Sequence, residues 1–483
     1  MTEPLIQEAD PARLQAVFAS QQATALAWRT STAAERIARI QRLVRALMDH
    51  REALYEAFAV DFRKSTVEVD SHELLPVLAE AQHAVSHLGR WMRPRPVWST
   101  LISATNSAWL EVQPRGRSLI IAPWNFPLNL SLGPLVSALA AGNPVILKPS
   151  EMTPQVSAVM ARIVEQAFEP HEVALFEGAL ATSQALLALP FDHVFFTGSP
   201  QVGKAVMAAA SQHLASVTLE LGGKSPMIVD ESADLRRAAE NIMWGKLINS
   251  GQVCLAVDHV FVHERVKEAL IAQCLAVLRE GWGHNDEAIR ANPALTRIVN
   301  AHHTLRLARL LDGARAQGAR VLCGGQVDLQ DCYVAPTLLD QVPDHARIMQ
   351  EEIFGPLLPI VGYRSLDEVI ERINRGPKPL ALYMWSSRHE HIQAVKARTS
   401  SGGMCINHCV LHSQHGNLPF GGVNHSGQGA SHGRWGFMAF SHERAVLKSW
   451  RLMLARWLTY QPMRPWKHQA LRGIMRWLQW RVG

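Results

Sequence analysis

The 483-residue chain is too long for a single hydrophobic core, and 48% hydrophobic against 19% charged residues excludes a disordered protein. Two or three globular domains are therefore expected. The net charge of +6 would suit a nucleic-acid partner, but seven basic residues and no acidic residue lie in residues 451–483. Removing these seven charges leaves about −1 for residues 1–450, so the main body gives no reason to expect nucleic acid.

The six cysteines stand at positions 254, 274, 323, 332, 405 and 409, without the spacing of a disulfide framework. In a chain of this length they indicate reduced thiols and a cytoplasmic protein. Apart from Cys254, we expect them to be small buried hydrophobic residues. The first residues show neither the basic nor the apolar region of a secretory signal. The uncharged stretch 118–147 contains four prolines, so buried strands around a helix are expected there rather than a membrane span.

The N-terminal region is predicted to be helical. Thr32 and Glu35 have the spacing of a capping box, and apolar residues then recur at helical period through Met48. A second helix is predicted over 51–62. This part of the chain contributes packing and carries no recognisable chemistry.

From residue 118 the pattern alternates between strand and helix. Strands are predicted over 118–122, 144–147, 193–197 and 217–221. Helices are predicted over 128–140, with a stop at 141–143, and from 203 to about 214. Strand, loop, helix and strand in succession indicate a parallel sheet with helices on its faces.

Two loops in this region are candidates for nucleotide contacts. The loop 198–203 leads from a strand into a helix, where phosphate binds readily, although it is not the G-x-G-x-x-G fingerprint. Lys148 and Glu151 follow a buried strand, where open α/β sheets bind ligands. They are suited to ribose hydroxyls, but these residues alone favour a solvated loop with an incidental ion pair.

A second α/β stretch follows. Strands are predicted over 227–229, 259–263, 356–361 and 380–385, and helices over 266–279 and 302–317.

Three separated residues carry the candidate chemistry. Cys254 supplies a soft nucleophile, Glu220 a carboxylate and Asn125 a neutral amide donor. Together they are able to attack a carbonyl, hold the oxyanion and activate water. Each alone is ambiguous, because most cysteines are buried hydrophobic residues and Glu220, at the end of a strand beside two glycines, is also what an ordinary loop carboxylate looks like.

A series of motifs in fixed order resolves the ambiguity. From about residue 15 to 450 the chain resembles the aldehyde dehydrogenase superfamily, and most closely its class 3-like branch of fatty and aromatic aldehyde dehydrogenases. The matching motifs are PWNFP at 123–127, KPSE at 148–151, FFTGSPQVGK at 195–204, LELGGKSP at 219–226, GQVC at 251–254, EEIFGP at 351–356, LPFGG at 418–422 and FSH at 440–442.

The resemblance implies an α/β fold with a Rossmann-like NAD(P)-binding domain, a second α/β catalytic domain and a small β oligomerisation extension. The implied boundaries are 1–93 and 116–220 for cofactor binding, 221–412 for catalysis, 94–115 and 413–450 for oligomerisation or bridging, and 451–483 for a tail. A homodimer is also implied.

The resemblance likewise implies the site. Cys254 would be the nucleophile, Asn125 and the Cys254 backbone N–H the oxyanion hole, and Glu220 the general base. The implied cofactor contacts are Trp124, Lys148, Glu151, Gly198, Ser199, Glu352 and Phe354. The reaction would be NAD(P)-dependent oxidation of medium-chain, long-chain or aromatic aldehydes through a thioester. Glu151 should repel a 2′-phosphate and favour NAD, with NADP as the alternative.

Two other functions stay open at this point. An acylating, coenzyme A-dependent dehydrogenase would need no general base, and Glu220 argues against it. A non-catalytic protein on the same scaffold would be marked by loss of Cys254 or Asn125, and both are present. Val253, residues 255–257 and Asn424 depart from the family pattern, which affects the expected substrate and not the reaction.

Histidines are dense between residues 408 and 442, beside Cys405 and Cys409. A zinc site is the alternative there, but no paired C-x-x-C frames it, and we expect no metal.

The tail, residues 451–483, combines basic residues with Trp457, Trp466, Trp477 and Trp480. A helix from about Lys467 would place Leu471, Ile474, Met475, Leu478 and Val482 on one face. That composition is typical of a helix lying on an anionic membrane, at the inner face in a cytoplasmic protein. Packing over a partner subunit or over the substrate entrance is the alternative.

Overall fold

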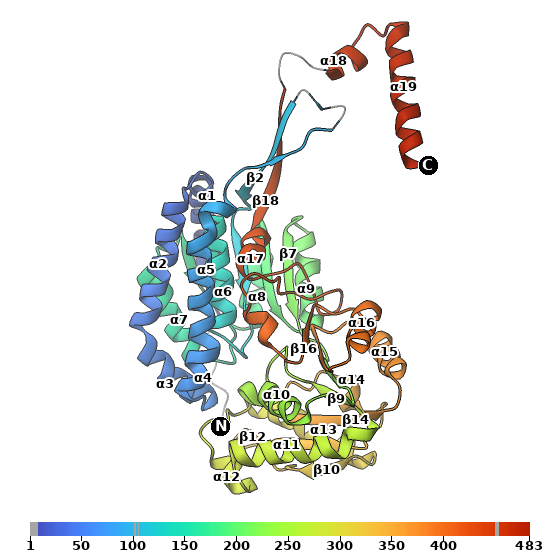
Figure 1. Ribbon diagram of the computed structural model, residues 1–483. Helices are drawn as coiled ribbons and strands as arrows, with labels where there is room; N and C mark the ends of the chain where they lie inside the picture. The colour runs from blue at the N-terminus through green and yellow to red at the C-terminus, as the bar shows by residue number, and fades with distance from the viewer. Residues whose placement is uncertain (1–7, 101–102, 105, 450–453) are drawn as a thin grey trace.

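The computed structural model describes residues 8–100, 103–104, 106–449 and 454–483. Two helix-flanked sheets make up the body, and a narrow β arm leads from it to two C-terminal helices (Figure 1). This is the predicted α/β architecture.

The first sheet has six strands. Five are parallel and one short strand joins antiparallel at the edge. In spatial order they are β17 (Gly427–Gln428), β7 (Ser216–Leu221), β6 (His193–Gly198), β3 (Ser118–Ile121), β4 (Val145–Lys148) and β5 (Val173–Leu175). All residues of β3 and β4 are buried, because helices cover both faces.

Alternate side chains of these strands meet different helices. Ile120, Leu147 and Phe195 pack with one group, comprising α2 (Ala33–Asp49), α3 (Arg51–Phe62), α5 (Leu75–Trp91), α6 (Asn129–Ala141) and α7 (Pro154–Ala167). Leu119 and Ile146 pack with α1 (Pro11–Trp28), α8 (Leu180–Leu187) and α9 (Pro200–Ser211). The short helix α4 (Thr66–Val69) precedes α5.

Local signals set several of these helix ends. The predicted capping box is formed, since the Thr32 side chain accepts from the Glu35 backbone N–H and Glu35 accepts from the Thr32 backbone N–H. Gly142 has φ 87° and ends α6 as predicted.

The second sheet has seven strands, all parallel except β10. In spatial order they are β10 (Arg320–Cys323), β13 (Thr337–Asp340), β14 (Leu357–Tyr363), β9 (His259–His263), β8 (Pro226–Val229), β15 (Ala381–Trp385) and β16 (Gly403–Ile406). A separate two-stranded ladder joins β11 (Val327–Asp328) and β12 (Tyr333–Val334).

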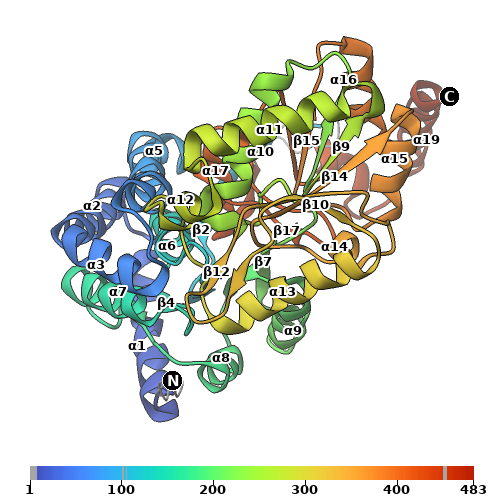
Figure 2. The same ribbon diagram turned by 90° about the horizontal axis from the view of Figure 1, so that it is seen from below.

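Helices cover both faces of this sheet too (Figure 2). One core contains residues of α10 (Leu235–Leu247) and α11 (Lys267–Trp282). The opposite face packs on α13 (Ala301–Ala316), α15 (Leu366–Arg375) and α16 (His389–Arg398). The shorter α12 (Asp286–Ala291) follows α11, and α14 (Arg347–Gln350) packs on α13.

The arm is a three-stranded antiparallel sheet of β1 (Arg95–Val97), β2 (Asn106–Pro114) and β18 (Ser441–Ser449). Of the described residues in the segment 413–450, predicted to serve oligomerisation or bridging, residues 441–449 belong to it. Residues 427–428 extend the first sheet instead, and α17 (Gly433–Ala439) packs on α5 and α6. The reason is that β17 finds open backbone groups at the edge of β7.

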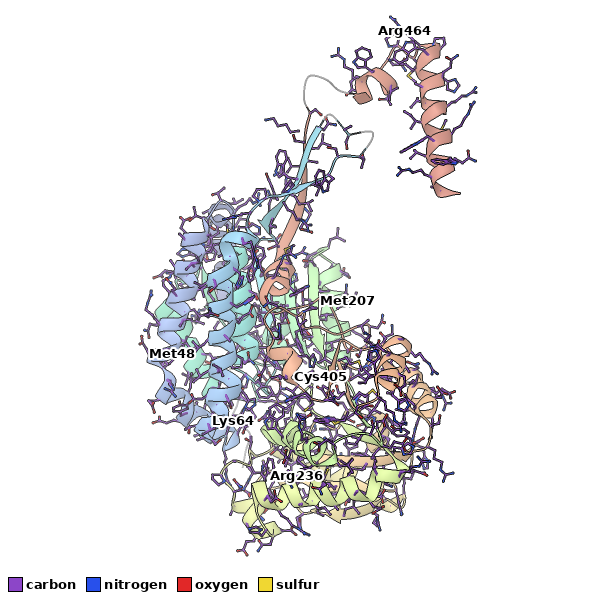
Figure 3. All side chains as sticks on the ribbon, in the orientation of Figure 1. Met48, Lys64, Met207, Arg236, Cys405 and Arg464 are labelled. Carbon is purple, nitrogen blue, oxygen red and sulfur yellow. The ribbon has the colours of Figure 1, made fainter. Side chains whose placement is uncertain are left out.

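Beyond the arm, α18 (Leu454–Thr459) and α19 (Pro465–Val482) stand apart from the body, on either side of the labelled Arg464 in Figure 3. The predicted tail helix is therefore present, while Arg451 lies outside the described residues. Within the described part of the chain, no helix combines the length and the apolar character that crossing a membrane requires.

Candidate active site

The loop that carries Cys254 is built from strained backbone. After α10 the chain turns through Ile248–Gly251, and Asn249, Ser250 and Gly251 have φ of 48°, 50° and 76°. A Cβ at Gly251 would lie 2.3 Å from the carbonyl oxygen of Gly355, so only glycine fits. This turn delivers Cys254 to the junction of the two sheets, where its side chain is only partly buried.

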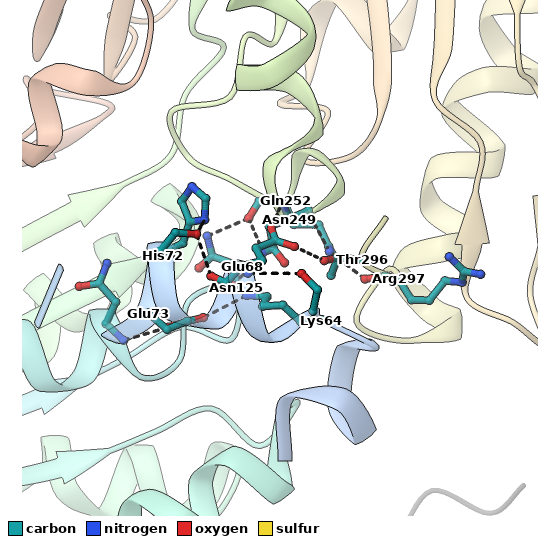
Figure 4. Close-up of polar contacts among 12 residues, drawn as sticks. Lys64, Glu68, His72, Glu73, Asn125, Asn249, Gln252, Thr296 and Arg297 are labelled. Atoms are coloured by element: carbon teal, nitrogen blue, oxygen red, sulfur yellow. Dashed lines mark hydrogen bonds and ion pairs between the residues drawn. The ribbon is translucent and has the colours of Figure 1, made fainter. Parts of the chain in front are cut away.

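A buried amide anchors this loop (Figure 4). Gln252 Nε2 donates to the carbonyl oxygens of Asn249 and Arg297, at 3.0 and 3.1 Å. Gln252 Oε1 accepts from the Val299 backbone N–H at 2.9 Å. Because both ends of the amide are bonded, the backbone two residues before Cys254 is held in one position.

A carboxylate from the N-terminal helices supports the same loop. Glu68 accepts from the Asn249 backbone N–H and from Thr296 Oγ1, each at 2.5 Å. The Cys254 loop is thereby joined to both α/β halves of the molecule (Figure 4).

Asn125, after β3, lies against the Cys254 loop as the sequence interpretation required. Its side chain is buried, and Nδ2 donates to the Gln252 carbonyl oxygen at 3.0 Å. Its backbone carbonyl accepts from Asn249 Nδ2 at 2.8 Å. The contact with Gln252 uses one of the two Nδ2 hydrogens of Asn125, which leaves the other to donate to a ligand beside Cys254.

Two carboxylates influence the thiol. The pKa of Cys254 is raised to about 12, first by burial and then by the charges of Glu352 and Glu220. The backbone N–H groups of Cys254 and Leu255 act in the opposite direction. The resting thiol is therefore neutral near pH 7, and it must lose its proton before it can attack.

Glu220, in β7, is almost fully buried. Its Oε1 accepts from Ser431 Oγ at 2.9 Å, and its Oε2 has no hydrogen-bond partner among the described residues. Burial raises the pKa of Glu220 to about 8, and the Ser431 hydrogen bond opposes that rise. A buried carboxylate of this kind is poised to exchange a proton near neutral pH.

Four of the predicted nucleotide contacts lie at the carboxyl ends of strands in the first sheet. Lys148 ends β4, and its Nζ pairs with Glu151 Oε2 at 2.9 Å. β6 ends at Gly198, and Ser199 caps α9 by accepting from the Val202 backbone N–H at 3.4 Å. A dinucleotide suits this edge, since strand ends and a helix N-terminus converge there.

Glu352 comes from the second sheet's side of the junction. Its carboxylate is pressed against Gly222, where a Cβ would lie 2.1 Å from Glu352 Oε2. Its Oε1 has no partner within the described ranges, and burial raises its pKa to about 8. An unpaired buried acceptor beside the strand ends that suit a dinucleotide fits the hydroxyl groups of a cofactor ribose.

Aromatic rings stand next to this carboxylate. Phe354 has φ 50°, and its ring lies 5.3 Å from Trp124, edge to face. The His303 ring lies 4.9 Å from Trp124. Burial lowers the pKa of His303 to about 4, so the imidazole is neutral. His303 was not predicted, because nothing in α13 distinguishes it from its neighbour His302.

Two more residues were missed. Lys224 Nζ donates to Asp258 Oδ2 at 2.5 Å and to the carbonyl oxygens of Ile348 and Glu351 at 2.9 and 2.8 Å. It thus ties the Glu352 segment to the glycine loop after β7. Its place in the LELGGKSP motif was the available signal. Ser431 had none, since it is 211 residues from Glu220.

The remaining cysteines match expectation only in part. Cys274, Cys405 and Cys409 are buried, but Cys323 and Cys332 are partly exposed. Both lie near β10 and the β11–β12 ladder at the margin of the second sheet, where they pack against the edges of two cores. Among the described residues, no group of three or more His, Cys, Asp or Glu side chains is arranged to hold a metal ion.

A dinucleotide-type sheet joined to a second α/β sheet, with a cysteine, an amide and a carboxylate at their junction, defines a cofactor-dependent enzyme acting on carbonyl groups. Residues 5–446 match the aldehyde dehydrogenase family. The chain belongs to this family, which confirms the resemblance and the predicted class of enzyme.

Individual relatives agree. A 4,4'-diaponeurosporen-aldehyde dehydrogenase of Staphylococcus aureus is 43% identical over 414 residues, covering 86% of this chain and 89% of the relative. Human aldehyde dehydrogenase family 3 member B1 is 42% identical over 450 residues, covering 93% and 94%. These relatives support the class 3-like branch.

Solved structures agree as well. The substrate-bound state of Staphylococcus aureus AldH superposes with a TM-score of 0.90 at 39% identity, covering 96% of this chain and 99% of that one. An NAD+ complex of a Bacillus cereus aldehyde dehydrogenase gives 0.82 at 28% identity, covering 92% and 90%. The protein is an NAD(P)-dependent aldehyde dehydrogenase.

Proposed function

We propose that Cys254 is the nucleophile, that Asn125 and the Cys254 backbone N–H form the oxyanion hole, and that Glu220 is the general base. The observation that carries this assignment is the convergence of the three groups. Asn125 touches the loop two residues before Cys254, and the charge of Glu220 reaches the thiol.

The chemistry follows from these positions. Cys254 Sγ loses its proton to solvent water and bonds to the aldehyde carbon, while the carbonyl π electrons move to oxygen and the amide donors stabilise the resulting charge. NAD supplies the hydride acceptor when it is bound, with Glu352 and Lys148 among the groups that would hold its riboses. The acyl group is left as a thioester on Cys254. Glu220 then takes a proton from water, whose oxygen attacks the thioester and releases the acid.

Stopped-flow kinetics with hexanal and NAD tests the nucleophile. Cys254→Ala should remove both the burst and the steady production of NADH, because the hydride leaves only from the adduct on sulfur. Cys332→Ala, which changes a partly exposed cysteine near the margin of the second sheet, serves as the control and should keep both phases. Substantial NADH formation by the Cys254→Ala enzyme would contradict the assignment.

For the substrate we propose medium-chain, long-chain or aromatic aldehydes, in line with the class 3-like relatives. For the cofactor we propose a preference for NAD, because Glu151 faces the position of the adenosine ribose in this assignment and would repel a 2′-phosphate. Measuring kcat/KM for aldehydes of two to sixteen carbons and for benzaldehyde, with each cofactor, tests both points. Equal use of NADP would argue against Glu151 as the selecting group.

We also propose that the enzyme is a cytoplasmic homodimer whose tail contacts the membrane. The support for the membrane contact is the exposed apolar surface on α18 and α19, where Trp457, Trp480 and Val482 are 64%, 77% and 90% exposed beside arginines. Such a surface suits the headgroup region of anionic lipids.

Removal of residues 451–483 tests the tail. The shortened enzyme should lose co-sedimentation with phosphatidylserine vesicles and keep hexanal oxidation, and the full chain should not bind neutral vesicles at the same salt. If instead the deletion changes the molar mass in solution and not vesicle binding, the tail packs on a partner subunit.

A further inference from the structure

We propose that Ser431 is a positioning residue for the catalytic carboxylate: its hydroxyl fixes Glu220 in the orientation from which it deprotonates the hydrolytic water. This inference rests on the proposed role of Glu220. It assigns a function to a residue of the C-terminal loop that the sequence motifs left unexplained.

The geometry is specific. Ser431 Oγ lies 2.9 Å from Glu220 Oε1, and both side chains are buried. Ser431 is itself held by a bridge to Phe420, in which its backbone N–H donates to the Phe420 carbonyl oxygen and the Phe420 N–H donates to the Ser431 carbonyl oxygen. A hydroxyl on so fixed a backbone has few orientations available, so it defines where the carboxylate sits.

The same loop fixes the backbone of Glu220. Through β17, Gly427 lies opposite Glu220, and the Leu221 backbone N–H donates to the Ser426 carbonyl oxygen at 3.1 Å. A Cβ at Gly427 would lie 2.3 Å from the Leu219 carbonyl oxygen, so the two chains approach as closely as glycine permits. Segment 426–431 therefore holds both the main chain and the side chain of the base.

The far end of the loop is anchored in the N-terminal helices. The Gly433 backbone N–H donates to both carboxylate oxygens of Glu80, at 2.9 and 3.0 Å. Between the two anchors, the His432 ring packs 4.9 Å from Phe420. The loop thus has a separate attachment on each side of Ser431, which keeps its hydroxyl from following a moving Glu220.

With Oε1 occupied by Ser431, only Oε2 is free to accept a proton from water. That oxygen is the one without a partner among the residues the structure covers. The hydroxyl also favours the ionised carboxylate over the neutral acid, so its loss should reduce the fraction of active base at neutral pH.

Other ionisable groups near Glu220 and Ser431 have to be distinguished from Glu220 itself. They are Cys254, Glu352 and His432. The pKa of Cys254 is about 12 and that of His432 about 4, so neither titrates between pH 6 and 9, whereas the pKa of Glu352 is also about 8. In the pH–rate profile of thioester hydrolysis, the limb that belongs to Glu220 is therefore the one that is missing in the Glu220→Gln enzyme.

The experiment measures thioester hydrolysis from pH 6 to 10 in the full-length enzyme, by rapid quench after a single turnover of NAD and hexanal. Ser431→Ala should keep the NADH burst, slow hydrolysis at pH 7 by roughly ten- to a hundredfold, and move the acid limb to higher pH, since hydrogen bonds to charged groups are of that strength. Ser431→Thr, which keeps the hydroxyl, should restore the rate to within about threefold of the original enzyme.

Ser441→Ala is the matched control, because it removes another buried serine hydroxyl of the same region, one bonded to the Phe437 carbonyl oxygen. It should leave the limb in place. Should Ser431→Ala fail to fold, Ser431→Cys keeps the volume with a much weaker donor and must show the same shift.

An unmoved limb in Ser431→Ala, an equal shift in Ser441→Ala, or a loss in Ser431→Thr as large as in Ser431→Ala would overturn the inference. Normal hydrolysis by Glu220→Gln would instead remove the proposed base. If Glu220→Gln hydrolyses the thioester slowly and Ser431→Ala hydrolyses it normally, the positioning role of Ser431 is rejected while the role of Glu220 as base stands.

Discussion

Lys64 and Glu73 form an ion pair with no exposed side-chain surface, and we predict that breaking it destabilises the N-terminal helices strongly. Nζ lies 3.0 Å from Oε1 and 4.9–5.1 Å from the ring centroids of Phe58, Phe62 and Phe126. Lys64→Met would leave the carboxylate in this apolar setting without its cation. Breaking a buried pair in this way costs about 3–5 kcal/mol.

The double variant Lys64→Met/Glu73→Gln should recover most of that loss. A glutamine oxygen still accepts from the Asn129 backbone N–H, which donates to Glu73 Oε2 at 3.0 Å, and no buried charge remains. The Phe126 ring packs on Lys64 and directly follows Asn125 in the chain. Lys64→Met should therefore also disturb the Asn125 side chain, the proposed oxyanion donor, and lower the rate of the NADH burst.

The stability deficit should depend on pH. Burial raises the pKa of Glu73, and the charge of Lys64 opposes this rise. Without Lys64 the folded-state pKa rises further above the unfolded value. The variant then keeps its stability below the unfolded-state pKa of Glu73 and loses it as the pH increases through the folded-state pKa. Lys64→Met should therefore be less stable at pH 8 than at pH 5.

Thermal unfolding followed by near-UV circular dichroism from pH 5 to 9 measures these effects. A domain of 150–250 residues loses about 2–4 °C per kcal/mol, so a drop of roughly 6–20 °C is expected for the single variant. A change below about 2 °C at pH 8, or a double variant less stable than the single one, would show that the pair is not the buried electrostatic contact described above.

Three further predictions concern the site and its supports. The thioester hydrolysis rate should rise with pH through about 8, where Glu220 ionises, and this limb should be absent in Glu220→Gln when hydrolysis is timed directly. Gly142→Ala should lower the free energy of unfolding by roughly 1–3 kcal/mol in urea titrations, because φ is 87° and a Cβ would lie 2.8 Å from the Arg36 guanidinium carbon. An unchanged midpoint would contradict that. Lys224→Met should raise KM for NAD more than it changes KM for hexanal, since it frees the Glu352 segment and leaves the Asp258 carboxylate without its cation; equal effects on both substrates would disprove this role.

Local features of the chain could be predicted from sequence, and contacts across the chain could not. The Thr32 capping box, the Gly142 helix end and the strand before Lys148 each depend on a few adjacent residues, and the structure contains all three. The candidate site was recognisable because Cys254, Glu220 and Asn125 each stand in a distinctive motif. Their mutual contacts depend on how two sheets meet, which no periodicity encodes.

Two of the residues that were missed share a physical reason. Ser431 and His303 are ordinary residue types in unremarkable surroundings, and only the folded chain gives them a neighbour worth noting. The pairing of residues 427–428 with β7 was likewise not recoverable. An edge strand of two residues, such as β17, has no alternating pattern long enough to read.

The loop around Ser431 also has a consequence for biosynthesis. The ribosome releases Glu80, Glu220 and Cys254 in that order, and the hydroxyl that orients the carboxylate emerges 211 residues after its partner. A nascent chain can therefore contain all strands of the second sheet and five of the six strands of the first and still lack a correctly aimed base. Under the proposed role of Ser431, full hydrolytic competence arrives only with the final part of translation.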